Sequence, residues 1–224
     1  FNKVFEERGL GYSWDVDEYG RLCEVGGGKE RMTFYMNKNK CWPEDCTNPT
    51  TEALVKGLPV DETRLALVKS CHARKTELFQ ELIGSGVVPL RPGILPLVDE
   101  AIAAGAPHAV CSTSNEAAVR TLVQTLMGEE RYASFEFFCG DCVPAKKPAP
   151  DVYNLAASTM KLPKGKCVVI EDSGIGCKAA KAAGMACLVT TSTYTVDEDF
   201  SGADRIVPEL EAAEVKLADL RALL

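Results

Sequence analysis

The chain lacks any long hydrophobic run. None of its apolar stretches approaches the roughly 18 residues that a membrane-spanning helix requires. It has no excess of positive charge either, because 25 lysines and arginines stand against 32 aspartates and glutamates, giving a net charge of −7 and a pI near 5.0. Proteins that bind phosphate backbones use basic surfaces, so this balance argues against a nucleic-acid partner. We expect a small-molecule ligand, with neither a membrane nor a nucleic acid as partner.

Strand patterns are nearly absent from residues 1–86, which read as helical. Apolar residues share one helix face at the start of the chain, and a short helix is predicted over 14–22. A longer helix is predicted from Asp61, a good N-cap, to the glycines at 84 and 86. We predict an all-α domain over residues 1–86, truncated at its start, because its first helix has no beginning of its own.

From Val87 onward, short apolar runs alternate with helical segments. The pattern predicts strands at 107–111, 135–139, 166–170, 185–189 and 205–207, with helices at 93–105, 115–127, 150–161 and 174–184. Strands separated by helices of this length indicate βαβ units and a parallel sheet. The fold class is therefore α/β, with a Rossmann-like core over 87–224 and a helical domain before it.

Two adjacent carboxylates follow the predicted strand 166–170. Glu171 and Asp172 stand directly before Ser173 and Gly174, which open a helix. Adjacent acids at a strand end repel one another unless a cation or a hydrogen-bond network lies between them. Oxygen ligands suit Mg²⁺, so we predict a magnesium site. The plainer interpretation is a polar strand end that caps the next helix.

Hydroxyl groups and a lysine follow the other strand ends. Ser112 to Asn115 follow one strand, and Lys146 and Lys147 come shortly after another. Ligands of parallel sheets bind outside the carboxyl ends of the strands. Hydroxyls and helix-start N–H groups bind an anion, a lysine neutralises it, and a metal held by carboxylates bridges to it. The shared placement predicts a phosphoryl-transfer site.

In these motifs the chain resembles the haloacid dehalogenase-like (HAD) hydrolase superfamily, in the branch with a helical cap. Ser112 resembles its second motif, Lys147 its third, and Glu171 with Asp172 its fourth. The texture is most similar to the CbbY-like proteins, which resemble β-phosphoglucomutase and act on xylulose 1,5-bisphosphate. Other stretches that carry the resemblance are 14–17, 26–32, 74–76 and 90–93.

One departure from the family is large. The resemblance implies an Asp-x-Asp pair on a first core strand, which would precede Phe1. Asp15 and Asp17 imitate the pair, but no buried strand precedes them. We therefore expect a core that lacks its first strand, and a chain that is inactive by itself.

The resemblance also implies a role for each candidate residue. Ser112 and Lys147 would be catalytic, and Asp172 would bind Mg²⁺ with Glu171 as an orienting residue or an outer ligand. The substrate would be bound by residues of the cap and of the loop after Ser112: Lys29, Arg31, Lys75, Thr113, Ser114 and Asn115. His72 is a further candidate, and Lys29 with Arg31 could instead be an ordinary solvated helix start.

Ten cysteines lie mostly inside apolar runs, as in reduced, core-filling thiols. Cys139 and Cys142 have the spacing of a redox pair, so redox regulation stays an alternative.

The leading hypothesis is a Mg²⁺-dependent phosphatase, a phosphoric monoester hydrolase acting on a sugar bisphosphate through an aspartyl-phosphate. A sugar-phosphate mutase of the same fold and a catalytically dead binding or regulatory protein are the alternatives.

We expect a monomer. Proteins of this branch occur in carbon-fixing bacteria and in plastids, so the expected location is the plastid in a photosynthetic eukaryote and the cytoplasm otherwise.

Overall fold

The structure is a computed structural model that describes residues 1–43, 46, 62–140 and 142–224. The chain forms two compact units, Phe1–Glu81 and Leu82–Leu224, and each is described by itself. Asp61, the predicted N-cap of the long helix, lies outside the described residues.

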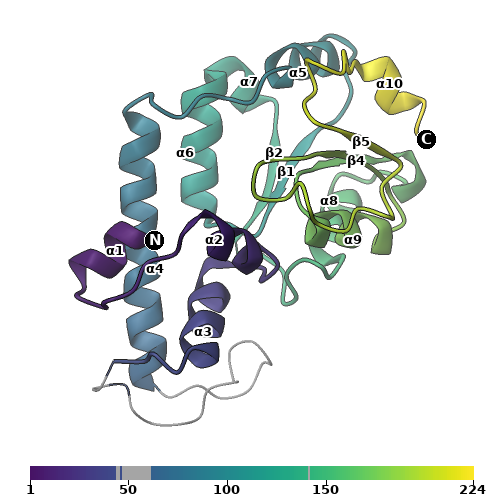
Figure 1. Cartoon of the computed structure of the whole chain (residues 1–224). Helices are drawn as coiled ribbons and strands as arrows, with labels where there is room; N and C mark the ends of the chain where they lie inside the picture. Colours follow the sequence, from purple (N-terminus) through teal and green to yellow (C-terminus); the bar gives the residue numbers. More distant parts are fainter. Residues whose placement is uncertain (44–45, 47–61, 141) are drawn as a thin grey trace. The chain divides into compact units, whose positions relative to one another are not determined.

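The regular structure of the first unit consists of helices, with no strand in the part that the structure describes. Its helices are α1 (Asn2–Glu7), α2 (Val16–Cys23), α3 (Gly28–Lys38) and most of α4 (Glu62–Gly84), as Figure 1 shows. Asp15 caps α2 by accepting a hydrogen bond from the Glu18 N–H at 2.7 Å. Lys29 and Arg31 lie in the first turn of α3, because this helix begins at Gly28.

Aromatic side chains fill the centre of this unit. Phe5 and Trp14 are buried, and their rings meet edge to face with centroids 4.8 Å apart. The rings of Phe1, Tyr12, Tyr19 and Tyr35 surround them. Such rings bury much apolar area per residue, which gives a small helical unit a core.

The second unit alternates strands with helices. Its strands are β1 (Ala109–Ser112), β2 (Glu136–Cys139), β3 (Val168–Glu171), β4 (Ala186–Thr190) and β5 (Arg205–Val207). Its helices are α5 (Ile94–Ala103), α6 (Glu116–Met127), α7 (Glu129–Ala133), α8 (Asp151–Thr159), α9 (Gly174–Ala182) and α10 (Leu217–Arg221), with a 3-10 turn at Lys164–Lys166. The predicted strands and helices are confirmed, and no bound shifts by more than two residues.

All strand pairs are parallel, as predicted, but the described strands form two sheets rather than one. One sheet pairs β1 with β2, and the other has the order β3-β4-β5. In the part of the chain that the structure describes, β1 and β3 therefore each have one edge without a strand partner. Ile170, in the middle of β3, is 38% exposed, and no residue of β1 is fully buried.

Alternate residues of β4 face two different helical layers. Cys187 and Val189 belong to a core with α8 and α9, whereas Leu188 packs with residues of α5 and of the C-terminal segment. Figure 1 shows α8 and α9 on one side of the strands and α5 and α10 on the other. A parallel sheet covered on both faces exposes its carboxyl ends, and the candidate site lies there.

No helix within the described residues is long and apolar enough to cross a membrane.

Candidate active site

One ammonium group connects the carboxyl ends of β1 and β3. Lys147 donates a hydrogen bond to the Cys111 carbonyl oxygen at 3.0 Å and pairs with the Oε1 atom of Glu171. The side chains of Lys147 and Glu171 are only 10% and 7% exposed. The loop after β2 thus places a cation between the two sheets, as the sequence predicted for the rim of the strands.

Glu171 is held through both carboxylate oxygens. Oε1 accepts from Lys147 and from the hydroxyl of Tyr153, while Oε2 accepts from the Asp172 N–H at 3.3 Å and from Ser173 Oγ at 3.4 Å. Gly176 packs directly against this carboxylate, with no room for a side chain. With its oxygens engaged, Glu171 suits the orienting role better than that of a direct metal ligand.

Asp172 differs from its neighbour. Its side chain is exposed, and among the described residues no side chain donates a hydrogen bond to its carboxylate. Loss of solvent around the carboxylate raises the pKa of Asp172, and the negative charge of Glu171 raises it further. The charges of Lys147 and Arg91 lower the pKa of Asp172, but neither side chain forms an ion pair with this carboxylate.

This arrangement fits a bound magnesium ion. Mg²⁺ binds through one or two carboxylates and keeps several waters or phosphate oxygens as its other ligands. Asp172 offers an unpaired carboxylate, and Lys147 already neutralises Glu171 beside it. Among the described residues, no group of three or more histidine, cysteine, aspartate or glutamate side chains could hold a metal by itself. Asp172 would therefore share the ion with ligands from elsewhere.

The loop after β1 is closed by its own hydroxyl and amide groups. Ser112 Oγ accepts a hydrogen bond from the Ser114 N–H at 3.1 Å, and Asn115 Oδ1 accepts from the Ala118 N–H at 3.2 Å. Asn115 is thus the N-cap of α6, and this contact orients its side chain. Ser112, Thr113 and Ser114 lie next to Cys111, whose carbonyl receives Lys147. Their proposed contacts with a phosphoryl group stay predictions.

Arg31 is tied to the end of α2. Its guanidinium donates to the carbonyl oxygens of Leu22 (Nε, 2.8 Å) and Val25 (Nη2, 3.3 Å) and to the Tyr19 hydroxyl (Nη1, 3.1 Å). These partners are neutral, so the positive charge of Arg31 is not cancelled by them.

Lys75 is a second cation of the first unit. Its ammonium lies over the rings of Phe79 and Phe1, 4.6 and 5.6 Å from their centroids. Burial lowers the pKa of Lys75, and the charge of Arg31 lowers it further. No carboxylate of the described residues pairs with it. Lys75 and Arg31 thus lie close together, and Lys29 is in the same first turn of α3 as Arg31.

His72 packs against Gly28. A Cβ atom on Gly28 would lie 2.8 Å from the His72 ring. Glycine at the start of α3 therefore leaves the space that the imidazole occupies. A contact between His72 and substrate stays a prediction.

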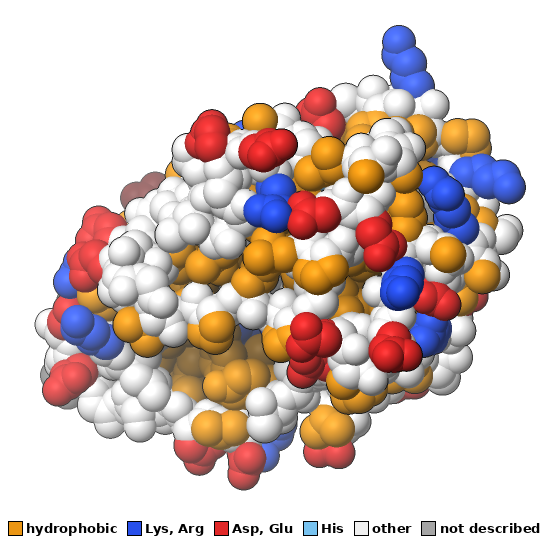
Figure 2. Space-filling model, turned by 90° about the horizontal axis from the view of Figure 1, so that it is seen from above, with side chains coloured by type: hydrophobic (Ala, Val, Ile, Leu, Met, Phe, Trp, Pro, Cys, Tyr) orange, Lys and Arg blue, Asp and Glu red, His pale blue; other side chains and the backbone are white. Residues whose placement is uncertain are grey.

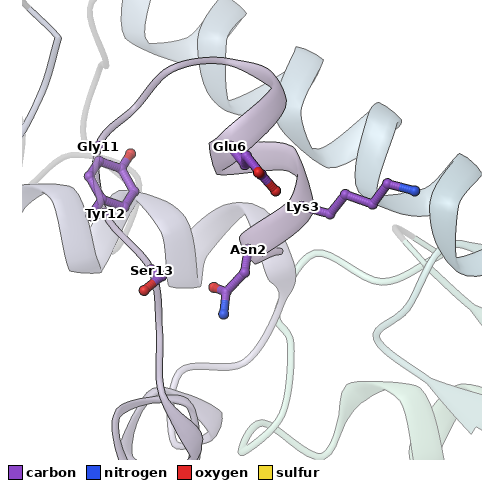
Figure 3. Close-up of a pocket in the computed structure, with 6 residues that line it drawn as sticks. All are labelled: Asn2, Lys3, Glu6, Gly11, Tyr12 and Ser13. Carbon is purple, nitrogen blue, oxygen red and sulfur yellow. The ribbon is translucent and has the colours of Figure 1, made fainter.

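A surface hollow of about 580 Å³ lies elsewhere in the first unit. It is lined by residues of α1 and of the segment after it: Asn2, Lys3, Glu6, Gly11, Tyr12 and Ser13. Figure 3 shows the Asn2 side chain turned toward Ser13, whereas Lys3 points away. None of the predicted site residues lines this hollow, and its polar groups form no charged cluster.

The surface drawn in Figure 2 mixes both charges. Acidic and basic side chains alternate there between apolar patches, and no continuous basic stripe appears on this face.

Two residues that contribute to the site were not found from the sequence. Tyr153, on α8, donates to Glu171, and Glu198, after β4, accepts the Gly174 N–H at 2.5 Å. A Cβ on Gly174 would lie 2.9 Å from Glu198 Oε2, so the start of α9 needs glycine there. No local pattern reports such contacts, because both partners are distant in sequence.

The predicted redox pair is unevenly placed. Cys139 is 2% exposed, and burial raises its thiol pKa to about 11, whereas Cys142 is exposed. Asp141, between them, lies outside the described residues. A buried, protonated thiol is a poor nucleophile, which weakens the redox alternative.

Comparison with known proteins identifies the family. The family model described as haloacid dehalogenase-like hydrolase matches residues 1–184. The chain belongs to this family. The resemblance inferred from Ser112, Lys147, Glu171 and Asp172 is thereby confirmed.

Within the haloacid dehalogenase-like hydrolases, relatives named CbbY are similar to this chain. A CBBY-like protein of Arabidopsis thaliana is 52% identical over 92% of the chain and 61% of its own length. The plasmid CbbY protein of Cupriavidus necator is 39% identical over 94% of the chain and 77% of its own length. The chain thus spans about three fifths of the plant relative.

A solved structure agrees with the fold. A mutant CbbY from Rhodobacter sphaeroides, in complex with xylulose 1,5-bisphosphate, superposes with a TM-score of 0.81 at 34% identity, covering 98% of this chain and 88% of that one. The α/β fold class is confirmed.

Proposed function

We propose that the protein is a Mg²⁺-dependent phosphatase of a sugar bisphosphate, with xylulose 1,5-bisphosphate as the leading substrate. The observation that carries the proposal is the position of Lys147, whose ammonium contacts Cys111 before Ser112 on one side and Glu171 before Asp172 on the other. A cation between a hydroxyl loop and a carboxylate pair is the arrangement that phosphoryl transfer requires.

The chain's own residues would divide the work as follows. Ser112 and the amides after it would hold phosphoryl oxygens, and Lys147 would neutralise the charge that develops on them. Asp172 would bind Mg²⁺, which when bound screens the negative phosphoryl group. Glu171 would keep Lys147 and the start of α9 in place. Each residue binds or orients, and none of them attacks phosphorus.

The nucleophile in this proposal is an aspartate outside the printed sequence. The open edges of β1 and β3 support it, because one more parallel strand between them would join the two sheets. Such a strand would cover Ile170 and end beside Lys147. Its carboxylate would form an aspartyl-phosphate that water then hydrolyses.

The bisphosphate is proposed from the cations of the first unit. Lys75 and Arg31 lie close together and have no carboxylate partner among the described residues, so an anionic group would relieve their repulsion. A substrate with a second phosphate offers such a group. Lys29 lies in the same turn of α3 as Arg31 and is proposed as a further contact. The CbbY structure with xylulose 1,5-bisphosphate is consistent with this substrate class.

The test is phosphate release from a panel of sugar mono- and bisphosphates, with and without Mg²⁺. The 224-residue chain is compared with a version extended at its N-terminus by a strand that carries an Asp-x-Asp pair. We expect turnover only by the extended protein, only with Mg²⁺, and fastest with a pentulose bisphosphate. Isomerised sugar phosphate without free phosphate would indicate a mutase instead. No reaction of either form would favour a binding protein, and turnover by the 224-residue chain would contradict an external nucleophile.

A further inference from the structure

Tyr153 is a buried group that the proposed mechanism does not use. It lies in the first turn of α8, is 4% exposed, and packs in the core that α8 and α9 share with β4. A Tyr hydroxyl in such a core needs a partner. Its partner is the Oε1 atom of Glu171, the same oxygen that pairs with Lys147.

Tyr153 also contacts Lys147 directly. The Lys147 ammonium lies over the tyrosine ring, 4.9 Å from its centroid. An ammonium over an aromatic face is attracted by the negative charge above the ring. The ammonium is therefore bounded on three sides by the Cys111 carbonyl, the Glu171 carboxylate and the Tyr153 ring.

The hydroxyl remains a donor under ordinary conditions. Burial raises the pKa of Tyr153 far above its usual range, and the adjacent Glu171 carboxylate raises it further. The phenol therefore keeps its proton, and Glu171 Oε1 receives one neutral and one charged donor. The neutral donor satisfies part of the carboxylate, so the ammonium need not be fully committed to it.

We propose that Tyr153 is a positioning residue, which shares Glu171 with Lys147 and so keeps the ammonium directed toward the end of β1. This inference rests on the proposed function, in which Lys147 serves a phosphoryl group there. Without the hydroxyl, Glu171 would draw the ammonium more tightly to itself. The charge available at the Ser112 loop would fall, although the core would stay packed.

The activity test compares Tyr153→Phe with wild type in the extended protein. Phenylalanine keeps the ring and removes only the hydroxyl. We expect kcat to fall by about tenfold, equivalent to about 1.4 kcal/mol, while KM for the sugar phosphate and the Mg²⁺ requirement stay within twofold. Tyr132→Phe is the matched control, because the partly buried Tyr132 hydroxyl accepts a hydrogen bond from Arg120 at 3.4 Å rather than donating one to Glu171. We expect its kcat to equal that of wild type.

A second readout needs no activity. Acetylation of Lys147 by an amine-reactive reagent is followed by peptide mass spectrometry in the 224-residue chain, with the exposed Lys164 as internal reference. Tyr153→Leu removes both ring and hydroxyl, and we expect Lys147 to be labelled at least about fivefold faster. Tyr132→Leu should leave the Lys147 rate unchanged.

The outcomes separate this inference from the proposed function. If the wild-type extended protein releases no phosphate but Tyr153→Leu still exposes Lys147, the contact stands and the proposed function fails. If Tyr153→Phe keeps the wild-type kcat, the hydroxyl does not position Lys147 for catalysis and the inference is overturned. An equal labelling rate in Tyr153→Leu and wild type would overturn it as well.

Discussion

The two units of the chain differ in the sign of the charge that has no ion-pair partner. In the first, the Arg31 guanidinium is tied to neutral carbonyls and Lys75 lies between aromatic rings, so positive charge remains uncompensated. In the second, Lys147 is paired with Glu171, and the charge that remains is the carboxylate of Asp172. An unpaired cation is suited to bind an anionic ligand, and an unpaired carboxylate is suited to bind a metal ion. The two units therefore differ in the kind of ligand that each is suited to bind.

The largest effect is expected from removing the compensated cation. Lys147→Met in the extended protein should lower turnover by about 10³-fold, because a fixed cation no longer meets the developing phosphoryl charge. It should also lower the free energy of unfolding by about 3 to 5 kcal/mol, since Glu171 is left as a buried, unpaired carboxylate. Phosphate release and urea unfolding measure the two effects. Lys164→Met, an exposed lysine, is the control and should change neither.

Asp172→Asn removes the open negative charge. We expect about a 10²-fold loss of turnover. Millimolar Mg²⁺ should raise the thermal midpoint of wild type but not of the variant, because only a folded state with the carboxylate gains binding energy. Thermal denaturation with and without Mg²⁺ checks this. Asp197→Asn, at an exposed position after β4, is the matched control. An equal Mg²⁺ response in both variants would show that Asp172 is not the ligand.

Lys75→Met removes the open positive charge. KM for a sugar bisphosphate should rise by about tenfold, while kcat/KM for a monophosphate should change little, because only the second phosphate loses a partner. Steady-state kinetics on both substrates measure the split. Lys69→Met, an exposed lysine on the same helix α4, should change neither constant. A loss of equal size on both substrates would contradict the assignment.

The pH dependence of stability should also distinguish Lys75. Its pKa is lowered by folding, so the unfolded chain binds more protons in the window between the lowered pKa and the unfolded value. Wild-type stability should therefore rise with pH through that window, and Lys75→Met should lack this rise. Urea unfolding at several alkaline pH values tests this difference, and a parallel course for both proteins would refute it.

The smallest effect is expected from the thiols of Cys139 and Cys142. The pKa values of Cys71 and Cys139 are both raised by burial. We expect the double variant Cys139→Ser with Cys142→Ser to respond to oxidised and reduced dithiothreitol within twofold of wild type, because a protonated thiol reacts slowly. Turnover after each treatment measures the response. A wild-type protein that oxidation inactivates and this variant protects would restore the redox hypothesis.

Most of the α/β architecture could be predicted from the sequence because each strand is a short apolar run between turn residues. The strand 205–207 was predicted with its observed ends, whereas 107–111 begins later, at Ala109. Strand ends depend on pairing, such as that of Ala109 with Glu136, and the sequence of one segment alone does not determine its pairing. The division into two sheets was missed for the same reason.

The site was predictable only where its residues follow strand ends. Ser112, Lys147, Glu171 and Asp172 carry charge or hydroxyls at recognisable places. Tyr153 does not, because a tyrosine in the first turn of a helix gives no sign that its hydroxyl meets a carboxylate on another element. The carbonyl partners of Arg31 could not be predicted either, because they are backbone groups that every residue carries.

The open edges of β1 and β3 also affect the self-association of the 224-residue chain in solution. A strand edge without a partner presents N–H and C=O groups that can pair with another molecule, and Ile170 adds an exposed apolar side chain beside them. Concentrated solutions of this chain should therefore cluster by edge-to-edge pairing, visible as growing light scattering. A protein whose edges are filled should stay dispersed at the same concentration.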